Sequence, residues 1–202
     1  MTDPLTATGR ELRGEDWYAE DLGAARFTDC TFVDVDLSEA TTAGAVFDAC
    51  TFAGCRFNSS VHRSSAFVAC ELNRCNFFDA TLEGCKLSGS VFVDCTLRPL
   101  TVTGGQWSGV TIRGATLTKL DLTGLDLREA DLSLSDLSGS VLRGCRLDGA
   151  SLRDTVLGGT DLRGASLDRV DLAAARLRRT KLDLQGAVLL AELHGADVDV
   201  TT

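Results

Sequence analysis

The chain has 202 residues, and its 29 acidic and 20 basic side chains give a formal net charge of −9 at pH 7. This length fits one domain with a real core, and the acidic balance argues against direct binding to nucleic acid. The start of the chain lacks the basic and apolar regions of a signal peptide, and apolar runs such as AVLL at 187–190 are too short to span a membrane. A cytoplasmic location without membrane contact is therefore expected.

The first ten residues, 1–10, show no repeat and are expected to form a terminal tail. From Leu12 to Leu182 a mostly apolar side chain recurs at every fifth position, and no insertion interrupts the 35 central positions of this series. A period of five fits neither the 3.6-residue period of a helix nor the two-residue period of a strand. Such repetition instead predicts a solenoid, in which each unit buries its apolar residue by stacking on its neighbours.

All eight cysteines lie two positions before a central residue, in a slot that otherwise holds mainly small residues such as alanine and serine. These cysteines are Cys30, Cys50, Cys55, Cys70, Cys75, Cys85, Cys95 and Cys145. Free cysteine behaves as a small buried hydrophobe, so the pattern predicts a narrow interior slot that contains reduced thiols. The spacing is not that of a zinc site, and no metal is expected.

Within the repeat, ADLSL at 130–134 and TDLRG at 160–164 match or nearly match a five-residue consensus, A-(D/N)-L-x-x. In this respect the chain resembles the pentapeptide repeat proteins over nearly its whole length. The resemblance implies an all-β solenoid, a right-handed quadrilateral β-helix with four pentapeptides per coil, so that residues 20 apart stack on each other. The repeats would then make about nine coils. The predicted domains are an N-terminal tail at 1–10, the β-helix at 11–183 and a C-terminal module at 184–202.

The least repeat-like stretch is NSSVHRSSA at 58–66, which contains the polar central residue His62. Four units per coil would stack His62 directly on Thr42, and a polar pair inside an apolar column must be hydrogen-bonded or turned outward. We predict a distorted or protruding loop formed by Ser60, Val61, His62 and Arg63. The alternative is an interior histidine whose hydrogen bonds are satisfied.

The repeat ends at Leu182, and the sequence LQGAVLLAELHGADVDV that follows predicts a short amphipathic helix ending near Gly195, then a brief strand at 197–200. An open solenoid end exposes apolar surface and strand edges, so it requires a cap. The apolar content exceeds the need of one coil end, which favours a cap that also forms a homodimer over a plain cap. The predicted dimer interface consists of Leu184, Val188, Leu189, Leu190, Leu193 and Val198.

No catalytic arrangement is recognisable in the sequence. His62 and His194 are the only histidines, and neither a Ser/His/Asp set nor a Cys/His set can be built from them. Glycine-rich phosphate-binding motifs are missing, and the aspartates that precede the repeated leucines belong to the repeat and are expected to face solvent. The chain is therefore predicted not to be an enzyme and to use no cofactor.

Four segments resemble one branch of this family, the MfpA and Qnr types of topoisomerase-protecting proteins that confer fluoroquinolone resistance. They are VHRSSAF at 61–67, SGSVFVDCTLRPLT at 88–101, LDLTGLDLREADLSLSDL at 120–137 and LDLQGAVLLAELHGADVDV at 182–200. The uninterrupted register resembles the MfpA type more than Qnr, whose coils carry loop insertions. The resemblance implies a dimeric rod that mimics B-form DNA, binds the DNA-binding saddle of DNA gyrase, modulates or inhibits the enzyme, and protects it from quinolone-type poisons.

When the outward residues are grouped by face, seven acidic residues outnumber four arginines on one face. The candidate gyrase-binding residues there are Asp34, Glu71, Asp94, Asp131, Asp154 and Asp171. DNA carries one phosphate about every 1.7 Å along its axis, so these carboxylates are far sparser, and mimicry would rest on shape while charge supplies steering. Two other functions stay open, namely shielding gyrase from a natural-product toxin and acting as an interaction scaffold unrelated to gyrase.

Overall fold

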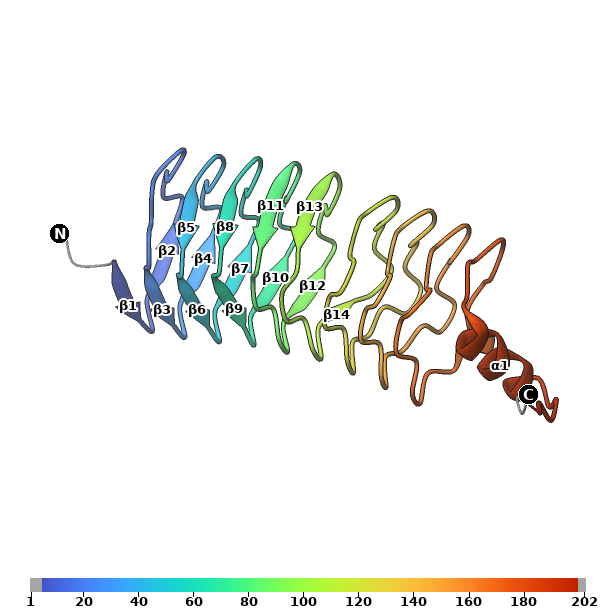
Figure 1. Cartoon of the computed structure of the whole chain (residues 1–202). Helices are drawn as coiled ribbons and strands as arrows, with labels where there is room; N and C mark the ends of the chain where they lie inside the picture. The colour runs from blue at the N-terminus through green and yellow to red at the C-terminus, as the bar shows by residue number, and fades with distance from the viewer. Residues whose placement is uncertain (1–4, 200–202) are drawn as a thin grey trace.

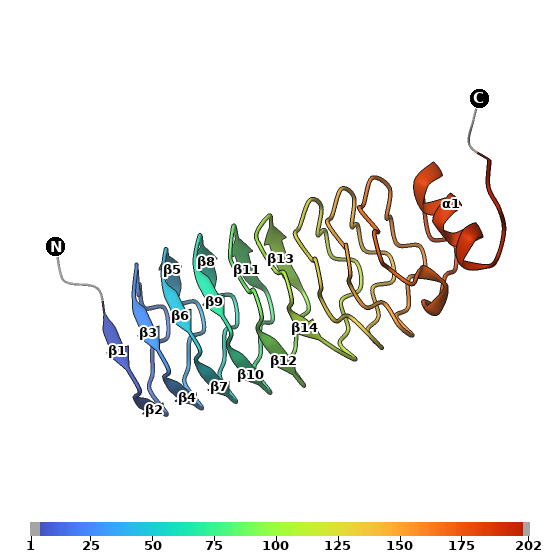
Figure 2. The same cartoon turned by 90° about the horizontal axis from the view of Figure 1, so that it is seen from below.

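The computed structural model describes residues 5–199, which wind into a rod of stacked coils with a helix at its C-terminal end (Figures 1 and 2). Residues 20 apart lie side by side in parallel register, so that Phe52 pairs with Phe32 on one side and with Leu72 on the other. Twenty residues per coil correspond to four five-residue units. The predicted β-solenoid is therefore confirmed.

Short strands form three parallel sheets on three sides of the coil. The first sheet contains β1 (Thr6–Thr8), β3 (Arg26–Thr28), β6 (Val46–Asp48) and β9 (Ala66–Val68). The second sheet contains β2 (Glu11–Arg13), β4 (Thr31–Val33), β7 (Thr51–Ala53), β10 (Glu71–Asn73), β12 (Val91–Val93) and β14 (Thr111–Ile112). The third sheet contains β5 (Thr41–Ala43), β8 (Val61–Arg63), β11 (Ala80–Glu83) and β13 (Leu100–Thr103).

The fourth side of the coil is joined by isolated parallel bridges, such as the one between Asp36 and Arg56. Beyond Ile112 every side is joined in this way, and the bridges continue to Lys181. Counted by its strands the solenoid has about five turns, fewer than the nine expected, while the bridges extend the winding beyond them. The change follows composition, because aromatic and β-branched residues that favour strands dominate the first half and Asp-Leu units the second.

The predicted N-terminal tail is partly wrong. Residues 6–8 form β1, in which Ala7 pairs with Phe27 of β3, and Thr31 donates its backbone N–H to the carbonyl of Arg10 at 2.8 Å. The small side chain of Ala7 occupies a central position without standing out in the sequence pattern. Residues 1–4 of the predicted tail lie outside the described part of the chain.

Corners of the coil place the residue two positions after a central residue in the left-handed region of backbone space. Asp34 has a φ of 55° and Gly84 has a φ of 61°, for example. Glycine adopts this conformation without steric cost, and short polar residues such as aspartate tolerate it better than other side chains. The frequent glycine and aspartate at these positions therefore allow the chain to turn at regular intervals.

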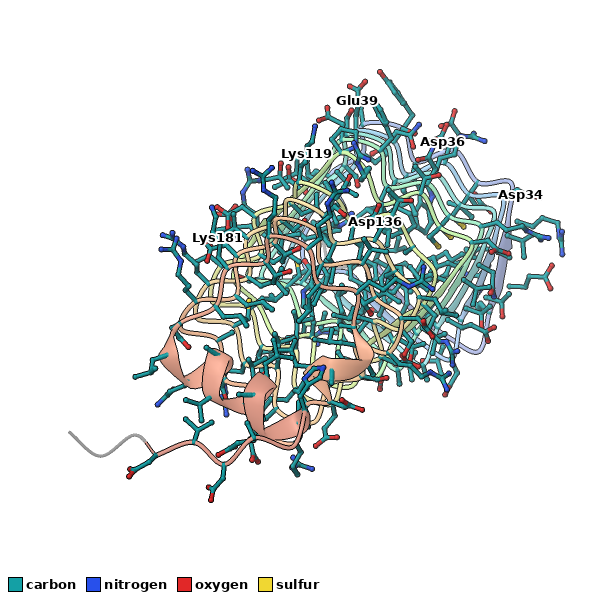
Figure 3. The ribbon with its side chains drawn as sticks, turned by 90° about the vertical axis from the view of Figure 1, so that its right-hand side faces the viewer. Asp34, Asp36, Glu39, Lys119, Asp136 and Lys181 are labelled. Carbon is teal, nitrogen blue, oxygen red and sulfur yellow. The ribbon has the colours of Figure 1, made fainter. Side chains whose placement is uncertain are left out.

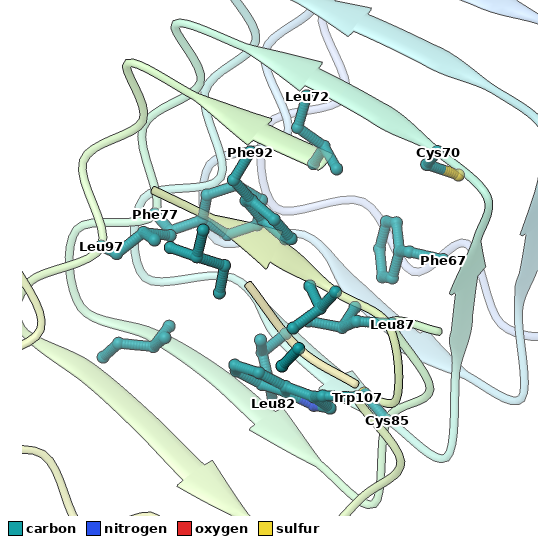
Figure 4. Packing of buried hydrophobic residues seen from close by; sticks show 14 of the residues in the cluster. Phe67, Cys70, Leu72, Phe77, Leu82, Cys85, Leu87, Phe92, Leu97 and Trp107 are labelled. Carbon is teal, nitrogen blue, oxygen red and sulfur yellow. The ribbon is translucent and has the colours of Figure 1, made fainter. Parts of the chain in front are cut away.

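Central side chains stack along the rod in columns. Ring centroids lie 4.5 Å apart between Phe32 and Phe52, and the same distance separates Phe57 from Phe77. Each aromatic pair of this kind contributes about 0.5–1.5 kcal/mol beyond the burial of its area. Figure 4 shows how aromatic and leucine side chains fill the same interior near Trp107. The core is thus a thin column that depends on every coil having its neighbours.

The slot two positions before each central residue is confirmed as an interior position for small side chains. All eight cysteines are free, and all except Cys95 are fully buried. Their thiols lie near backbone carbonyls, as in the contact of 3.5 Å between Cys55 Sγ and Phe32 O. Burial raises the pKa of the Cys145 thiol to about 11, so this group stays protonated at neutral pH.

The predicted loop around His62 is wrong, because Val61–Arg63 form the regular strand β8 and the His62 side chain is fully buried. Thr42 Oγ1 lies 2.8 Å from His62 Nδ1, and Ser60 Oγ lies 3.0 Å from His62 Nε2. Both ring nitrogens therefore have partners, which removes the cost of burying a polar ring. The alternative of a satisfied interior histidine is the correct one.

At the C-terminal end, a 3-10 turn η1 (Leu172–Ala174) precedes the helix α1 (Leu184–Leu193). Asp183 caps the start of α1 by accepting from the N–H of Gly186 at 3.0 Å, and Gly195 follows the helix with a φ of 86°. The predicted helix and its glycine stop are confirmed. The predicted strand at 197–200 is not formed at 197–199, and Val200 lies outside the described residues. In the part of the chain that the structure describes, no helix has the length and apolar character that a membrane span requires.

Candidate partner-binding surfaces

The six predicted acidic residues all flank the second sheet or the bridges that continue it. Glu71 begins β10, Asp131 bridges Thr111, the first residue of β14, and Asp171 caps η1 by accepting from the N–H of Ala174 at 3.2 Å. Asp34, Asp94 and Asp154 occupy corners next to this sheet, each with a φ between 53° and 58°. The structure therefore brings the six residues onto one side of the rod and its adjoining edge.

Ion pairs divide these acidic residues into two groups. In the C-terminal half, Arg113 lies 3.4 Å from Asp131 and Arg176 lies 3.2 Å from Asp154. Among the described residues, Asp34, Glu71, Asp94 and Asp171 form no ion pair. Asp34 and Glu71 in the first coils, Asp94 in the middle of the rod and Asp171 near its C-terminal end therefore carry the uncompensated negative charge on this side.

The side of the coil built from isolated bridges carries charges of opposite sign at its two ends. Acidic residues predominate in its first coils and basic residues in its later ones: Asp16, Asp36, Glu39 and Asp79 with Arg56 come first, then Arg98, Lys119, Arg176, Arg178 and Arg179 with Asp136. Figure 3 looks along the rod and shows Asp36, Glu39 and Lys119 at neighbouring parts of its rim, with Asp34 at a separate corner. The sum over this side is close to neutral, so only reading the charges in order along the rod reveals the asymmetry.

Asp36 is the most strongly held carboxylate on that side. Burial opposes its ionisation, but hydrogen bonds from Arg56 and Ser38 outweigh this effect and lower the pKa of Asp36 to about 2. Arg56 Nη2 lies 2.8 Å from Asp36 Oδ2 in the next coil. This pair fastens adjacent coils together and is less available to a partner than an unpaired acid.

The expectation that aspartates before repeated leucines face solvent is wrong for Asp161. Its side chain is buried, and both Arg143 and Arg163 approach one of its oxygens at 2.7 Å. The two arginines come from the same coil and the preceding one, so their guanidinium groups close over the carboxylate. Asp161 is therefore a structural residue that joins two coils.

The predicted dimer residues separate into packed and exposed groups. Leu189 and Leu190 pack against the end of the solenoid core, and Val188 and Val198 are half-buried. Leu184 is 72% exposed and Leu193 is 40% exposed, at opposite ends of α1. Nine residues, or two and a half turns, separate Leu184 from Leu193, so the two exposed leucines lie on opposite faces of α1.

The two histidines and the potential metal ligands are spread over residues 5–199. No cluster of three or more histidine, cysteine, aspartate or glutamate side chains there could hold a metal ion. His62 is enclosed in the core, while His194 lies at the end of α1 with Nδ1 2.8 Å from the carbonyl of Leu190.

Stacked coils of four five-residue units define the class of pentapeptide solenoids, and comparison with known proteins agrees. The sequence profile described as "Pentapeptide repeats (8 copies)" matches residues 70–98, 108–144 and 145–183, which together exceed half of the chain. The chain belongs to the pentapeptide repeat family and has its right-handed quadrilateral β-helix fold. No curated protein sequence matches the chain significantly.

Similar solved structures include QnrB1, described as a plasmid-mediated fluoroquinolone resistance protein. One trypsin-treated variant has a TM-score of 0.70 at 19% identity, covering 96% of this chain and 98% of that chain. A second trypsin-treated variant has a TM-score of 0.62 at 20% identity, with the same coverage. Full-length QnrB1 has a TM-score of 0.52 at 22% identity, covering 95% of this chain and 100% of that chain. At these identities the similarity concerns the fold.

Proposed function

We propose that this protein is a non-enzymatic binder of DNA gyrase that occupies the enzyme's DNA-binding surface and thereby modulates it and protects it from quinolone-type poisons. The observation that carries the proposal is an unbranched rod with uncompensated carboxylates, Asp34 and Glu71, on one side of its first coils. QnrB1, a fluoroquinolone resistance protein, shares this architecture over nearly its whole length, which supports the same kind of role.

Shape and charge contribute unequally to the proposed mimicry. A duplex carries a phosphate about every 1.7 Å of its axis, which a few carboxylates on a protein rod cannot match. The rod therefore competes through its elongated form, and its acidic side raises the rate of encounter with a basic surface. No sequence-specific contact is required, because the partner would recognise a shape that it already binds.

A homodimer joined through α1 completes the proposal. Leu184 and Leu193 are exposed apolar side chains at the two ends of the helix that closes the solenoid, and a twofold contact between the capped ends of two rods would cover apolar surface there. Such a dimer would double the length of the rod and present two equivalent acidic sides. The proposed location is the cytoplasm, where gyrase meets DNA.

A supercoiling assay tests the proposed function. Purified protein is titrated into the cognate gyrase at several salt concentrations, with and without ciprofloxacin. Inhibition without the drug, or recovery of activity in its presence, is the expected outcome, and both effects should weaken as salt rises because the acidic side supplies the steering. Absence of either effect in every condition would overturn the proposal and favour a scaffold with another partner.

A natural-product toxin in place of ciprofloxacin addresses the second candidate function. Protection from such a toxin without protection from quinolones would assign a self-resistance role that uses the same binding surface. The fold itself does not separate these roles, because one architecture supports many functions.

A further inference from the structure

The ladder of hydrogen bonds between coils is interrupted after the coil that contains β13. In the flanking coils the central residue donates to the next coil, as Phe77 N–H does to Thr96 O at 2.8 Å and Leu117 N–H does to Asp136 O at 2.8 Å. Within residues 5–199, Leu97 makes no corresponding bond to Thr116. The same holds for the N–H groups of Asp94 and Asp121.

This interruption affects one part of the coil and leaves the rest joined. Val91 of β12 still pairs with Thr111 of β14, and Trp107 N–H donates to Asp126 O at 2.8 Å. Figure 1 shows the coil with β13 set apart from the next coil along its upper edge, while β12 and β14 stay adjacent. The two coils therefore stay in contact at the second sheet and separate from each other on the neighbouring side of the rod.

The space between the separated parts of the two coils is a groove of about 440 Å³. One wall contains Asp94, Cys95, Thr96, Leu97 and Arg98, and the other contains Arg113, Gly114, Ala115 and Thr116. Cys95 and Ala115 occupy the interior slot, yet both are only half-buried, whereas Cys75 in the same column is 1% exposed. Side chains that regular stacking would cover are thus accessible from this groove.

Pro99 contributes to the opening because it has no backbone N–H group to donate to the next coil. In the neighbouring coils, the residue at this corner donates its N–H across the junction, as Asp79 does to Pro99 O at 2.7 Å and Lys119 does to Ser138 O at 3.0 Å. Proline has no N–H, so this bond cannot form between the two walls of the groove. The sequence itself therefore removes one of the hydrogen bonds that would hold the two walls together.

We infer that this groove binds an extended polypeptide segment, which enters as an added strand between the two walls. Each wall presents unpaired N–H and C=O groups in the register of the solenoid's own ladder. An extended backbone offers alternating donors and acceptors along both of its edges, and no other common ligand satisfies two facing strand edges at once. The occupant is a partner segment with a leucine at the central position and a small residue two places before it.

An aspartate immediately before the leucine fits the walls as well. Thr96 and Thr116 occupy the corresponding position on the two walls. Elsewhere in the rod the same arrangement is satisfied, because Thr41 Oγ1 donates to Asp21 Oδ1 of the preceding coil at 3.1 Å. The preferred segment therefore has the form small-Asp-Leu, the composition of a pentapeptide coil. Its carboxylate would accept hydrogen bonds from the two threonines.

Hydrogen exchange with a peptide probe tests this inference on the full chain. The probe is a blocked peptide of sequence LSDLSGSVLR, copied from 134–143, where it fills the same part of a regular coil. Without the probe, the amides of Leu97 and Thr116 should exchange much faster than those of Phe77 and Asp136, and saturating probe should slow them. Groove amides that are already as slow as the reference amides, or that ignore the probe, would overturn the inference.

Alkylation of Cys95 supplies a second readout, because the other seven cysteines are buried. Iodoacetamide labelling of Cys95 should show a saturable loss as the probe is added. Thr116→Trp fills the groove and should abolish this protection, whereas Asp136→Trp, one coil further along the same side, should preserve it. Thr96→Trp repeats the block from the opposite wall in case the first variant folds poorly. Equal protection in the blocked variants would show that the probe binds elsewhere.

Discussion

At the scale of single residues, His62 shows how the solenoid accepts a titratable group in its core. Ser60 Oγ donates to Phe57 O at 2.7 Å, so it accepts from His62 Nε2–H, and His62 Nδ1 then accepts from Thr42 Oγ1–H. This assignment satisfies both nitrogens of a neutral ring. Burial lowers the pKa of His62 to about 4 because the charged form would lose its hydration.

The protein should lose stability on mild acidification because of this histidine. The folded pKa is depressed, so the unfolded chain binds the proton more readily, and stability falls as pH drops from about 6.5 to about 4. The loss attributable to His62 is up to about 3 kcal/mol across that window. Urea unfolding midpoints measured at several pH values should therefore fall more steeply in the native protein than in His62→Leu.

His194→Gln removes the other histidine from the exposed end of α1 and serves as the control. It should retain the steep pH dependence of the native protein. Asp36 does not confuse the result, since its pKa of about 2 confines the loss of its contribution to pH values below about 3.8. Equal slopes in the native protein and His62→Leu would mean that the buried ring does not control acid stability.

At the scale of elements, Asp183 joins the last coil to α1. Its Oδ1 accepts from Gly186 N–H at 3.0 Å, and its Oδ2 accepts from Gly164 N–H at 2.6 Å. Asp183→Ala should lower the free energy of unfolding by about 1–2 kcal/mol, because the helix loses its cap and its tie to the coil. Urea denaturation measures this change, with Asp197→Ala beyond the helix as the control. An unchanged midpoint would show that apolar packing alone holds α1.

Dimer formation should depend on the exposed apolar residues of α1. Replacing Leu184 and Leu193 with glutamate should give soluble monomers, because two charges would be placed in the proposed interface while the packed residues Leu189 and Leu190 stay in place. Sedimentation equilibrium measures the change in mass. Leu134→Glu, which alters another exposed leucine away from α1, should leave the mass unchanged. A persistent dimer in the double variant would place the interface elsewhere.

The sequence predicted the solenoid and α1 well because each depends on a repeated or local pattern. The environment of His62 was predictable only in part: the repeat placed His62 on Thr42, but it did not decide between a buried ring and one turned outward, which depends on the hydrogen bonds to Thr42 and Ser60. The groove was not predictable, because the five-residue period continues through Leu97 and Leu117 while the coils around them diverge. A period determines which side chains face inward, but it does not determine the spacing of successive coils.

At the scale of the whole molecule, the distribution of charge matters more than its total. Arg113 pairs with Asp131 and Arg176 pairs with Asp154, which leaves Asp171 as the one unpaired predicted acid of the last coils, whereas both Asp34 and Glu71 of the first coils form no ion pair among the described residues. The groove at Leu97 and Thr116 lies between these two halves of the rod. A basic partner surface should therefore meet the N-terminal half of the second sheet first.

Reversing charge at the first coils should weaken gyrase inhibition selectively. Asp34→Lys with Glu71→Lys places two positive charges on the acidic side, and the concentration needed for half-inhibition should rise by about tenfold or more at low salt. Asp29→Lys with Asp48→Lys changes the net charge equally but lies along the first sheet, and it should have a much smaller effect. All four residues are exposed, so neither pair should unfold the rod.

The salt dependence of inhibition distinguishes direct contact between these carboxylates and gyrase from an effect of the protein's net charge. If Asp34 and Glu71 touch the partner, the first pair should lose both affinity and part of the salt dependence, while the second pair keeps the native dependence. Equal weakening by both pairs would mean that gyrase senses only net charge. Unchanged inhibition in the first pair would move the contact to another side of the rod, where Glu39 and Asp79 of the early coils are the next residues to reverse.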